Sequence, residues 1–379
     1  MIFITAGKHE APRASRITNR RWAFSALGAA AAATLTTRDT VYCCTPLHHP
    51  AGTLVTAGSA LVGGARLALA SRFEPTTFWD EVRRYGATVV FYAGEMCRRL
   101  VDAPPTLGEK NHPVRLFAGS GMRPDVWRRL VARFGPVAVL EFYASTEASA
   151  VLANASGQKL GAVGRALPGS PELVIAAWDH PTDDFARDLG GKLQRARVDE
   201  PGMLIARIDG RTNADLAHVD PRRLLRDAFA PGDIWFVTGD FLRMDTGGDY
   251  WFVDRHQDLI QTAHGPVPSM RIEDALYAAS TPGHGIAMCI AVGTPDGAHE
   301  VPAVAIELAA GATLDLDALA AAIRTLPDHA RPRRLRVVAE VPVTDGYRPI
   351  KRPVAALGFA PGPGVWRWDN HAQALVAGA

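Results

Sequence analysis

Residues 137–147 read VAVLEFYASTE, and this stretch decides the fold. Its apolar part, Val137–Phe142, predicts a strand that is buried on both faces. Ligands of open α/β sheets bind beyond the carboxyl ends of the strands, and Tyr143, Thr146 and Glu147 follow there. An aromatic face, a hydroxyl and a carboxylate could stack a base, bond a phosphate and hold Mg²⁺. Taken alone, the stretch is more typical of a loop with a capping threonine and a solvated glutamate.

Strands and helices alternate along the sequence that precedes this stretch. Apolar and β-branched runs predict the strands Met1–Ile4, Thr40–Cys44, Leu67–Ala70, Ala87–Tyr92 and Val114–Phe117. Helical periodicity, alanine-rich composition or a leading proline predicts the helices Arg20–Leu35, Pro75–Tyr85, Met96–Asp102 and Asp125–Phe134. This alternation indicates an α/β unit with a largely parallel sheet.

The pattern changes after Leu173. Residues 179–192 predict an irregular exposed loop, and residues 202–253 predict short antiparallel strands joined by turns. Beyond Asp254 the sequence predicts a small α+β unit with helices Ile272–Ala279 and Leu316–Leu326 and strands Ile286–Val292 and Ala303–Leu308. We therefore expect a large domain over residues 1–253, a connecting segment at 254–258 and a small domain over 259–379.

The composition argues against several classes of protein. The formal net charge is +2 and no basic stripe alternates with aromatic residues, so no nucleic-acid partner is expected. The four cysteines lack zinc-ligand spacing and are too few for a disulfide framework, which indicates a reducing, cytoplasmic location. The segment Thr18–Phe24 is similar to a twin-arginine export signal, but we interpret it as part of the alanine-rich helix.

Three further polar stretches follow predicted strands or tight turns. Gly119-Ser120-Gly121 would let a flat ligand approach the backbone, and Thr238-Gly239-Asp240 places a carboxylate where it could grip two vicinal hydroxyls. Asp254-Arg255 follows shortly after, and each stretch could separately be turn chemistry. The sequence lacks the glycine patterns of serine hydrolases and of dinucleotide-binding folds. Acyltransferases that use a histidine base would need an acidic residue at position 53, where this sequence has Thr53.

Together and in order, these stretches resemble the adenylate-forming superfamily of acyl-CoA synthetases, peptide-synthetase adenylation domains and luciferases. The similarity continues in other motifs: the phosphate loop at Thr5–Arg13, the acyl-pocket motif at Pro46–Gly52, a loop motif at Gly161–Gly169, the hinge motif at Asp254–Ile260 and the lysine motif at Val341–Lys351. The spacing most resembles the fatty-acid-transport and very-long-chain acyl-CoA synthetase branch. The resemblance implies an AMP-binding large domain, a hinge at 254–258 and a small mobile C-terminal domain.

The resemblance also implies a role for each matching residue. Those assigned to the nucleotide are Thr5 and Gly7 in the phosphate loop, Gly119, Ser120, Gly121 and Tyr143 around the adenine, Thr146 at the α-phosphate, and Asp240 and Arg255 at the ribose. Glu147 would bind Mg²⁺, His48 would border the acyl pocket and Gln257 would be the hinge residue.

The catalytic lysine of the family has two candidates in this sequence. The motif places Arg348 at that position, and Lys351 lies three residues further along the sequence. The lysine would stabilise charge that develops on the carboxylate and the α-phosphate. Lys351 is preferred here, because an ammonium is a compact point charge and a guanidinium is a poor substitute for one.

The phosphate loop departs most from the family pattern. Such loops act through backbone N–H groups, hydroxyls and the absence of competing negative charge. Here Glu10 replaces a glycine, while Lys8, His9 and Arg13 add positive charge. The sequence also begins at the strand that leads into this loop, so we expect that the family's first subdomain is missing or that a partner chain supplies it.

The resemblance implies that ATP and a fatty or related carboxylic acid give acyl-AMP and pyrophosphate, after which CoA, as co-substrate, gives the thioester. Peripheral membrane contact is compatible with such a substrate. The alternative function is a non-catalytic or fragmentary relative that binds nucleotide, acyl chain or a partner without turnover. Glu10 and the uncertain lysine favour that alternative, whereas Glu147, Asp240 and Arg255 favour an enzyme.

Overall fold

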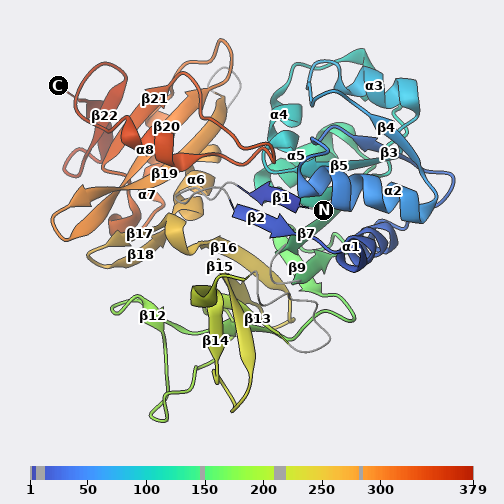
Figure 1. Cartoon of the computed structure of the whole chain (residues 1–379). Helices are drawn as coiled ribbons and strands as arrows, with labels where there is room; N and C mark the ends of the chain where they lie inside the picture. Colours follow the sequence, from blue (N-terminus) through green and yellow to red (C-terminus); the bar gives the residue numbers. More distant parts are fainter. Residues whose placement is uncertain (1, 6–12, 146–149, 209–218, 281–284, 379) are drawn as a thin grey trace.

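The computed structural model describes residues 2–5, 13–145, 150–208, 219–280 and 285–378. Within these ranges the chain forms one 12-stranded sheet and a separate 5-stranded sheet near the C-terminus. The two sheets belong to a large and a small domain that lie beside each other (Figure 1). The predicted α/β architecture with a smaller C-terminal domain is thus confirmed.

The first half of the large domain is parallel, as the alternation predicts. Its strands are β3 (Thr40–Cys43), β4 (Arg66–Leu69), β5 (Val89–Ala93), β6 (Leu116–Ser120) and β7 (Ala138–Ala144), in the order β4-β3-β5-β6-β7. Its helices are α1 (Asn19–Ala32), α2 (Gly58–Gly63), α3 (Phe78–Tyr85), α4 (Met96–Asp102) and α5 (Pro124–Phe134), with the short hairpin β1 (Ile2–Thr5) and β2 (Arg13–Arg16).

Two features of this half differ from the predictions. The predicted helix at Pro75–Tyr85 begins only at Phe78, because residues 74–77 form turns. A π-helix at Ala51–Ala57 continues directly into α2, and no helix was predicted there. The segment 51–63 is rich in glycine, threonine and valine, which are weak helix formers, so propensity gives no helical signal.

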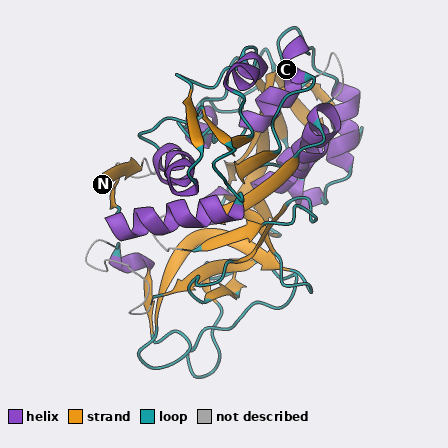
Figure 2. Ribbon diagram, turned by 90° about the vertical axis from the view of Figure 1, so that its right-hand side faces the viewer, coloured by secondary structure: helices purple, strands orange, loops and turns teal. Residues whose placement is uncertain are grey.

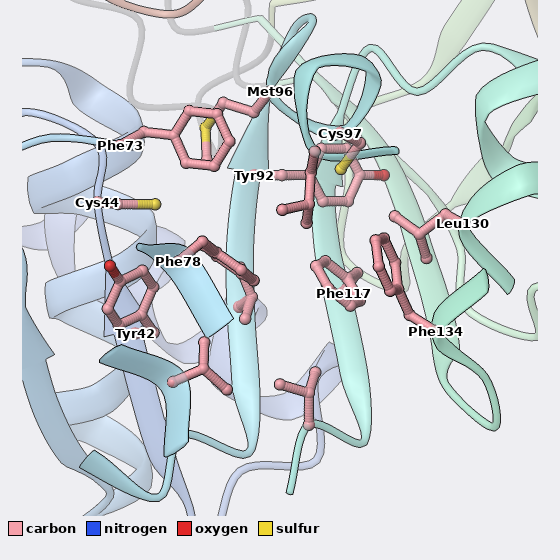
Figure 3. Packing of buried hydrophobic residues seen from close by; sticks show 14 of the residues in the cluster. Tyr42, Cys44, Phe73, Phe78, Tyr92, Met96, Cys97, Phe117, Leu130 and Phe134 are labelled. Atoms are coloured by element: carbon pink, nitrogen blue, oxygen red, sulfur yellow. The ribbon is translucent and has the colours of Figure 1, made fainter. Parts of the chain in front are cut away.

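A buried core lies between the parallel strands and helices α3, α4 and α5. Phe78, Phe117 and Phe134 are almost fully buried there, and Trp79 packs on Phe134 with ring centroids 4.6 Å apart. Figure 3 shows how these side chains gather with sulfur-bearing neighbours on one face of the sheet. This packing fixes β5, β6 and β7 against one another, and the carboxyl ends of these strands form one side of the site described below.

The second half of the large domain is antiparallel. It contains β8 (Val151–Asn154), β9 (Ala162–Ala166), β10 (Leu173–Ala176), β13 (Gly202–Arg207), β14 (Leu224–Arg226), β15 (Ile234–Met244) and β16 (Tyr250–Arg255). Strands β13 and β14 and the loops near them project below the helices (Figure 1), and Figure 2 shows this region of strands and loops turned by 90°. The loop predicted at 179–192 contains β12 (Asp184–Phe185) and the last residue of β11 (Trp178–Asp179). The two strands pair as a small hairpin, in which Phe185 packs against Trp178.

The small domain follows the short 3-10 turn η5 (His256–Asp258). It contains β17 (Leu259–Thr262), β18 (Gly265–Pro268), α6 (Ser269–Tyr277), β19 (Ile286–Asp296), β20 (His299–Leu308), α7 (Leu316–Arg324), β21 (Arg334–Val338), α8 (Lys351–Ala356), β22 (Val365–Asp369) and β23 (Ala374–Ala377). The segment before α8, red in Figure 1, reaches across to the large domain near α4 and α5.

Candidate active site

The site begins at the glycine-rich end of β6. Gly119 packs so closely on β5 that an added Cβ would lie 2.2 Å from the Tyr92 carbonyl oxygen, which excludes any side chain. Gly121 has a φ of +100°, a conformation that L side chains rarely adopt. The backbone N–H of Gly121 donates to Glu141 Oε1 at 2.6 Å. Glycine is therefore required at both ends of the predicted adenine-contacting segment.

Glu141 on β7 organises this segment, and the sequence analysis missed it. Besides Gly121, the N–H of Met122 and the hydroxyl of Tyr92 donate to its carboxylate. Burial raises the pKa of Glu141 to about 8, although these three hydrogen bonds and the charge of Arg348 lower it. A single carboxylate in an otherwise apolar strand was the available signal, because buried charges need specific partners.

Tyr143, Asp240 and Arg255 come together from three strands. Asp240 on β15 lies directly opposite Arg255 on β16, with 3.9 Å between Asp240 Oδ1 and Arg255 Nε. The Tyr143 hydroxyl donates to Asp240 Oδ2 at 2.6 Å. Burial raises the pKa of Asp240, while Tyr143 and Arg255 oppose the shift. One carboxylate oxygen, Oδ1, thus keeps acceptor capacity for a polar ligand.

A loop of the small domain, Thr344–Arg348, enters the site from the opposite side. The N–H of Glu95 donates to the Tyr347 carbonyl at 3.0 Å, and the Tyr347 ring meets Phe73 edge-on at 5.7 Å. Gly94 accommodates this contact, since an added Cβ would lie 2.4 Å from the Tyr347 oxygen. The loop is therefore held by backbone contacts to the large domain.

Arg348 faces the cluster around Asp240. Removal of water and repulsion from Arg255 lower the pKa of Arg348 to about 10, whereas Asp240, Tyr143 and Glu141 act in the opposite direction. The residue is nevertheless exposed to solvent. At neutral pH it is a cation whose charge interacts with Asp240, Tyr143 and Glu141.

Lys351 lies elsewhere, at the first residue of α8. Its Nζ is 2.8 Å from Glu273 Oε1 and also donates to the Ser269 hydroxyl. Burial lowers the pKa of Lys351, but the charges of Glu273 and Asp254 outweigh burial, so the pKa is raised. Both members of the pair are buried, with exposed side-chain fractions of 14% and 2%. In this arrangement Lys351 joins elements of the small domain, and the choice between Arg348 and Lys351 as the catalytic cation stays a prediction.

The remaining predicted residues lie around this centre or outside the described ranges. His48 is exposed, and its Nε2 lies 2.8 Å from Asp345 Oδ2 in the inserted loop. Gln257 is exposed within η5. Gly7, Thr146 and Glu147 lie outside the described residues, and only the backbone of Thr5 is described. Their roles stay predictions.

Neither a cluster of metal-ligating side chains nor a membrane-spanning helix occurs in the described ranges. No group of three or more His, Cys, Asp or Glu side chains gathers there in a way that could hold a metal ion. None of the helices described has the length and apolar content needed to cross a bilayer.

Comparison with known proteins places these observations in a family. Residues 12–185 match the AMP-binding enzyme family. The chain is 34% identical to the medium/long-chain-fatty-acid–CoA ligase FadD6 of Mycobacterium tuberculosis, over 92% of this chain and 58% of that protein. It is 32% identical to human long-chain fatty acid transport protein 3, over 95% of this chain and 53% of that protein. The chain thus spans little more than half the length of these relatives.

Solved structures share the fold. The ATP-bound MatB of Rhodopseudomonas palustris superimposes with a TM-score of 0.76 at 21% identity, covering 94% of this chain and 67% of that one. The O-succinylbenzoate coenzyme A synthetase MenE of Bacillus subtilis, in complex with ATP and magnesium, gives 0.70 at 20% identity, covering 93% and 69%. Sequence and fold agree, and the chain therefore contains an AMP-binding domain of the adenylate-forming superfamily.

Proposed function

We propose that the chain carries out ATP-dependent activation of a fatty or related carboxylic acid, through acyl-AMP to acyl-CoA. One observation supports this most: Tyr143, Asp240, Arg255 and Arg348 gather beside the close-packed glycines of β6. The names of the relatives, a fatty-acid–CoA ligase and a fatty acid transport protein, indicate the class of acid.

The described residues fit a nucleotide. Gly119 and Gly121 leave the backbone open to a flat base, and Asp240 Oδ1, 3.9 Å from Arg255 Nε, would accept from a ribose hydroxyl. In the first half-reaction a carboxylate oxygen bonds to the α-phosphorus, and the bond between that phosphorus and the bridging oxygen of pyrophosphate breaks. Arg348 would stabilise the negative charge that develops between the two groups.

Mg²⁺ and CoA complete the proposed reaction. Mg²⁺ would neutralise phosphate charge when bound, and Glu147 would hold it. In the second half-reaction the CoA thiol sulfur bonds to the acyl carbonyl carbon, AMP leaves and the thiol proton passes to solvent. We propose that Gln257 is the hinge at which the small domain, residues 259–379, turns between the two half-reactions.

The setting of the reaction is also a proposal. We infer a cytoplasmic enzyme in contact with fatty acids and, peripherally, with membranes. Exposed apolar side chains on α1, α2 and β4, among them Phe24, Leu61 and Leu69, offer a surface for a further segment or partner chain.

Carboxylate-dependent exchange of pyrophosphate into ATP tests the proposed function. Fatty acids of graded length are the substrates, and Asp240→Ala is the control. Exchange that depends on the acid and disappears in the control supports adenylation. Folded protein that shows no exchange with any acid contradicts the proposed function. It supports the alternative, a relative that binds nucleotide or acyl chain without turnover. The arginine at the family's lysine position, Arg348, favours that alternative.

Removal of one hydroxyl should weaken nucleotide binding selectively. Tyr143→Phe deletes the donor to Asp240 at 2.6 Å, so the carboxylate loses a partner that orients it. Since a hydrogen bond to a charged group contributes about 1.5–3 kcal/mol, the KM for ATP should rise by about tenfold or more. The KM for the acid should change little. An unchanged KM for ATP would contradict the assigned geometry.

A further inference from the structure

Arg123 connects the glycine segment of the site to the small domain. It caps the start of α5, directly after Gly121 and Met122, and only 8% of its side chain is exposed. Its guanidinium lies 2.5 Å from Glu273 Oε2 and 2.6 Å from Asp274 Oδ1, both on α6 of the small domain. Glu95, at 3.5 Å, is its partner within the large domain. A single buried cation therefore bridges the two domains.

A second buried arginine supports the same contact. Arg98 is 2% exposed and is held by Glu95 at 2.8 Å and by Asp125 at 3.0 Å. Its guanidinium stacks on the ring of Tyr277, at 3.5 Å from the centroid, and Tyr277 belongs to α6. Helix α6 thus contacts two arginines of the large domain: Arg123 through ion pairs and Arg98 through a cation–π contact.

The ion pairs of Arg123 continue towards the loop Thr344–Arg348 of the small domain. Glu273 binds Arg123 with Oε2 and Lys351 with Oε1, and it also accepts from the N–H of Ala291. Lys351 begins α8, just after the segment that carries Arg348 into the site. A continuous set of ion pairs, Arg123–Glu273–Lys351, therefore runs from the glycine segment to the base of the loop.

We propose that Arg123 is a positioning residue for the adenylation half-reaction: it fixes α6 and, through Glu273 and Lys351, places Arg348 at the α-phosphate. This rests on the proposed function. Buried ion pairs are costly to desolvate, and apolar residues would hold two fixed surfaces at least as well. Charged groups become solvated again when the surfaces separate, so they suit a contact that forms in one half-reaction and opens in the other.

The variant Asp274→Ala tests the proposal with little risk to folding, because the Asp274 side chain is 46% exposed. We expect the rate of carboxylate-dependent pyrophosphate exchange to fall by about tenfold. Thioester formation from supplied acyl-AMP and CoA should stay within about twofold of the unaltered chain. Arg123→Lys keeps the charge but loses the two-armed contact, so it should retain more exchange than Arg123→Met. The matched control is Asp328→Ala, which removes an exposed pair with Arg331 inside the small domain.

A distance measurement separates this proposal from the proposed function. Spin labels on Arg128→Cys and Asp317→Cys report on the two domains, since both positions are exposed and the native cysteines are buried. We expect a narrow distance distribution that broadens with Asp274→Ala and not with Asp328→Ala. If the unaltered chain shows no exchange, the proposed function fails and the adenylation role fails with it, whereas the broadening would still show that the contact of Arg123 with Asp274 holds α6 against the large domain. An unchanged distribution, or equal loss in both half-reactions, overturns it.

Discussion

Arg348→Ala should lower carboxylate-dependent pyrophosphate exchange by about 10²–10³-fold, the usual effect of removing one group that stabilises transition-state charge. The cation faces Asp240, Tyr143 and Glu141 and is held there by the contact of Tyr347 with Glu95. The KM values for ATP and acid should change less than kcat, because the charge that Arg348 offsets develops in the transition state. Single-turnover formation of acyl-AMP is the direct measurement.

Two further variants of Arg348 test whether the positive charge itself causes the loss of exchange. Arg348→Lys keeps the positive charge, and we expect it to retain at least a tenth of the exchange. Arg348→Gln, similar in length but neutral, should be as inactive as the alanine variant. Full exchange in Arg348→Ala would remove the cation from the proposed mechanism and return the assignment to Lys351.

Local sequence patterns predicted most of the large domain because its elements are stabilised by local packing. The run Val137–Phe142 predicted β7, and the amphipathic stretch Asp125–Phe134 predicted α5 almost to the residue. The π-helix at Ala51–Ala57 was missed, since its formation depends on burial against the rest of the domain and not on propensity. Strand β21 was missed for a similar reason, because it pairs with distant parts of the chain, whereas β22 and β23 form a local hairpin that was also missed.

The site was predicted as a set of residues but not as a geometry. Nothing in the sequence places Asp240 directly opposite Arg255, because strand register depends on tertiary pairing. The preference for Lys351 over Arg348 rested on the chemistry of an ammonium and stays a prediction. The sequence could not show that Glu273, which lies far away in sequence, pairs with Lys351 at 2.8 Å. Buried ion pairs between distant residues leave no local pattern.

Lys351→Met should lower the free energy of unfolding by about 1–3 kcal/mol, since the buried Glu273 carboxylate loses one of its two cationic partners and keeps Arg123. Glu273 is 2% exposed and would lose its closest cationic partner within the small domain. Urea denaturation at pH 7 measures the change. Lys159→Met is the matched control: Lys159 is 41% exposed and pairs with Asp245 and Asp249, so its loss should cost much less than the loss of Lys351.

The pH dependence identifies the buried carboxylate as the origin of this loss. Burial raises the pKa of Glu273, but Lys351 and Arg123 outweigh burial and lower it from 4.5 to about 2. The stability that this shift contributes is present above pH 4.5 and disappears as the pH falls towards 2. The difference between Lys351→Met and the unaltered chain should therefore shrink in acid. A difference that stays constant from pH 7 to pH 3, or a variant as stable as the unaltered chain, would show that the pair of Lys351 with Glu273 does not stabilise the fold.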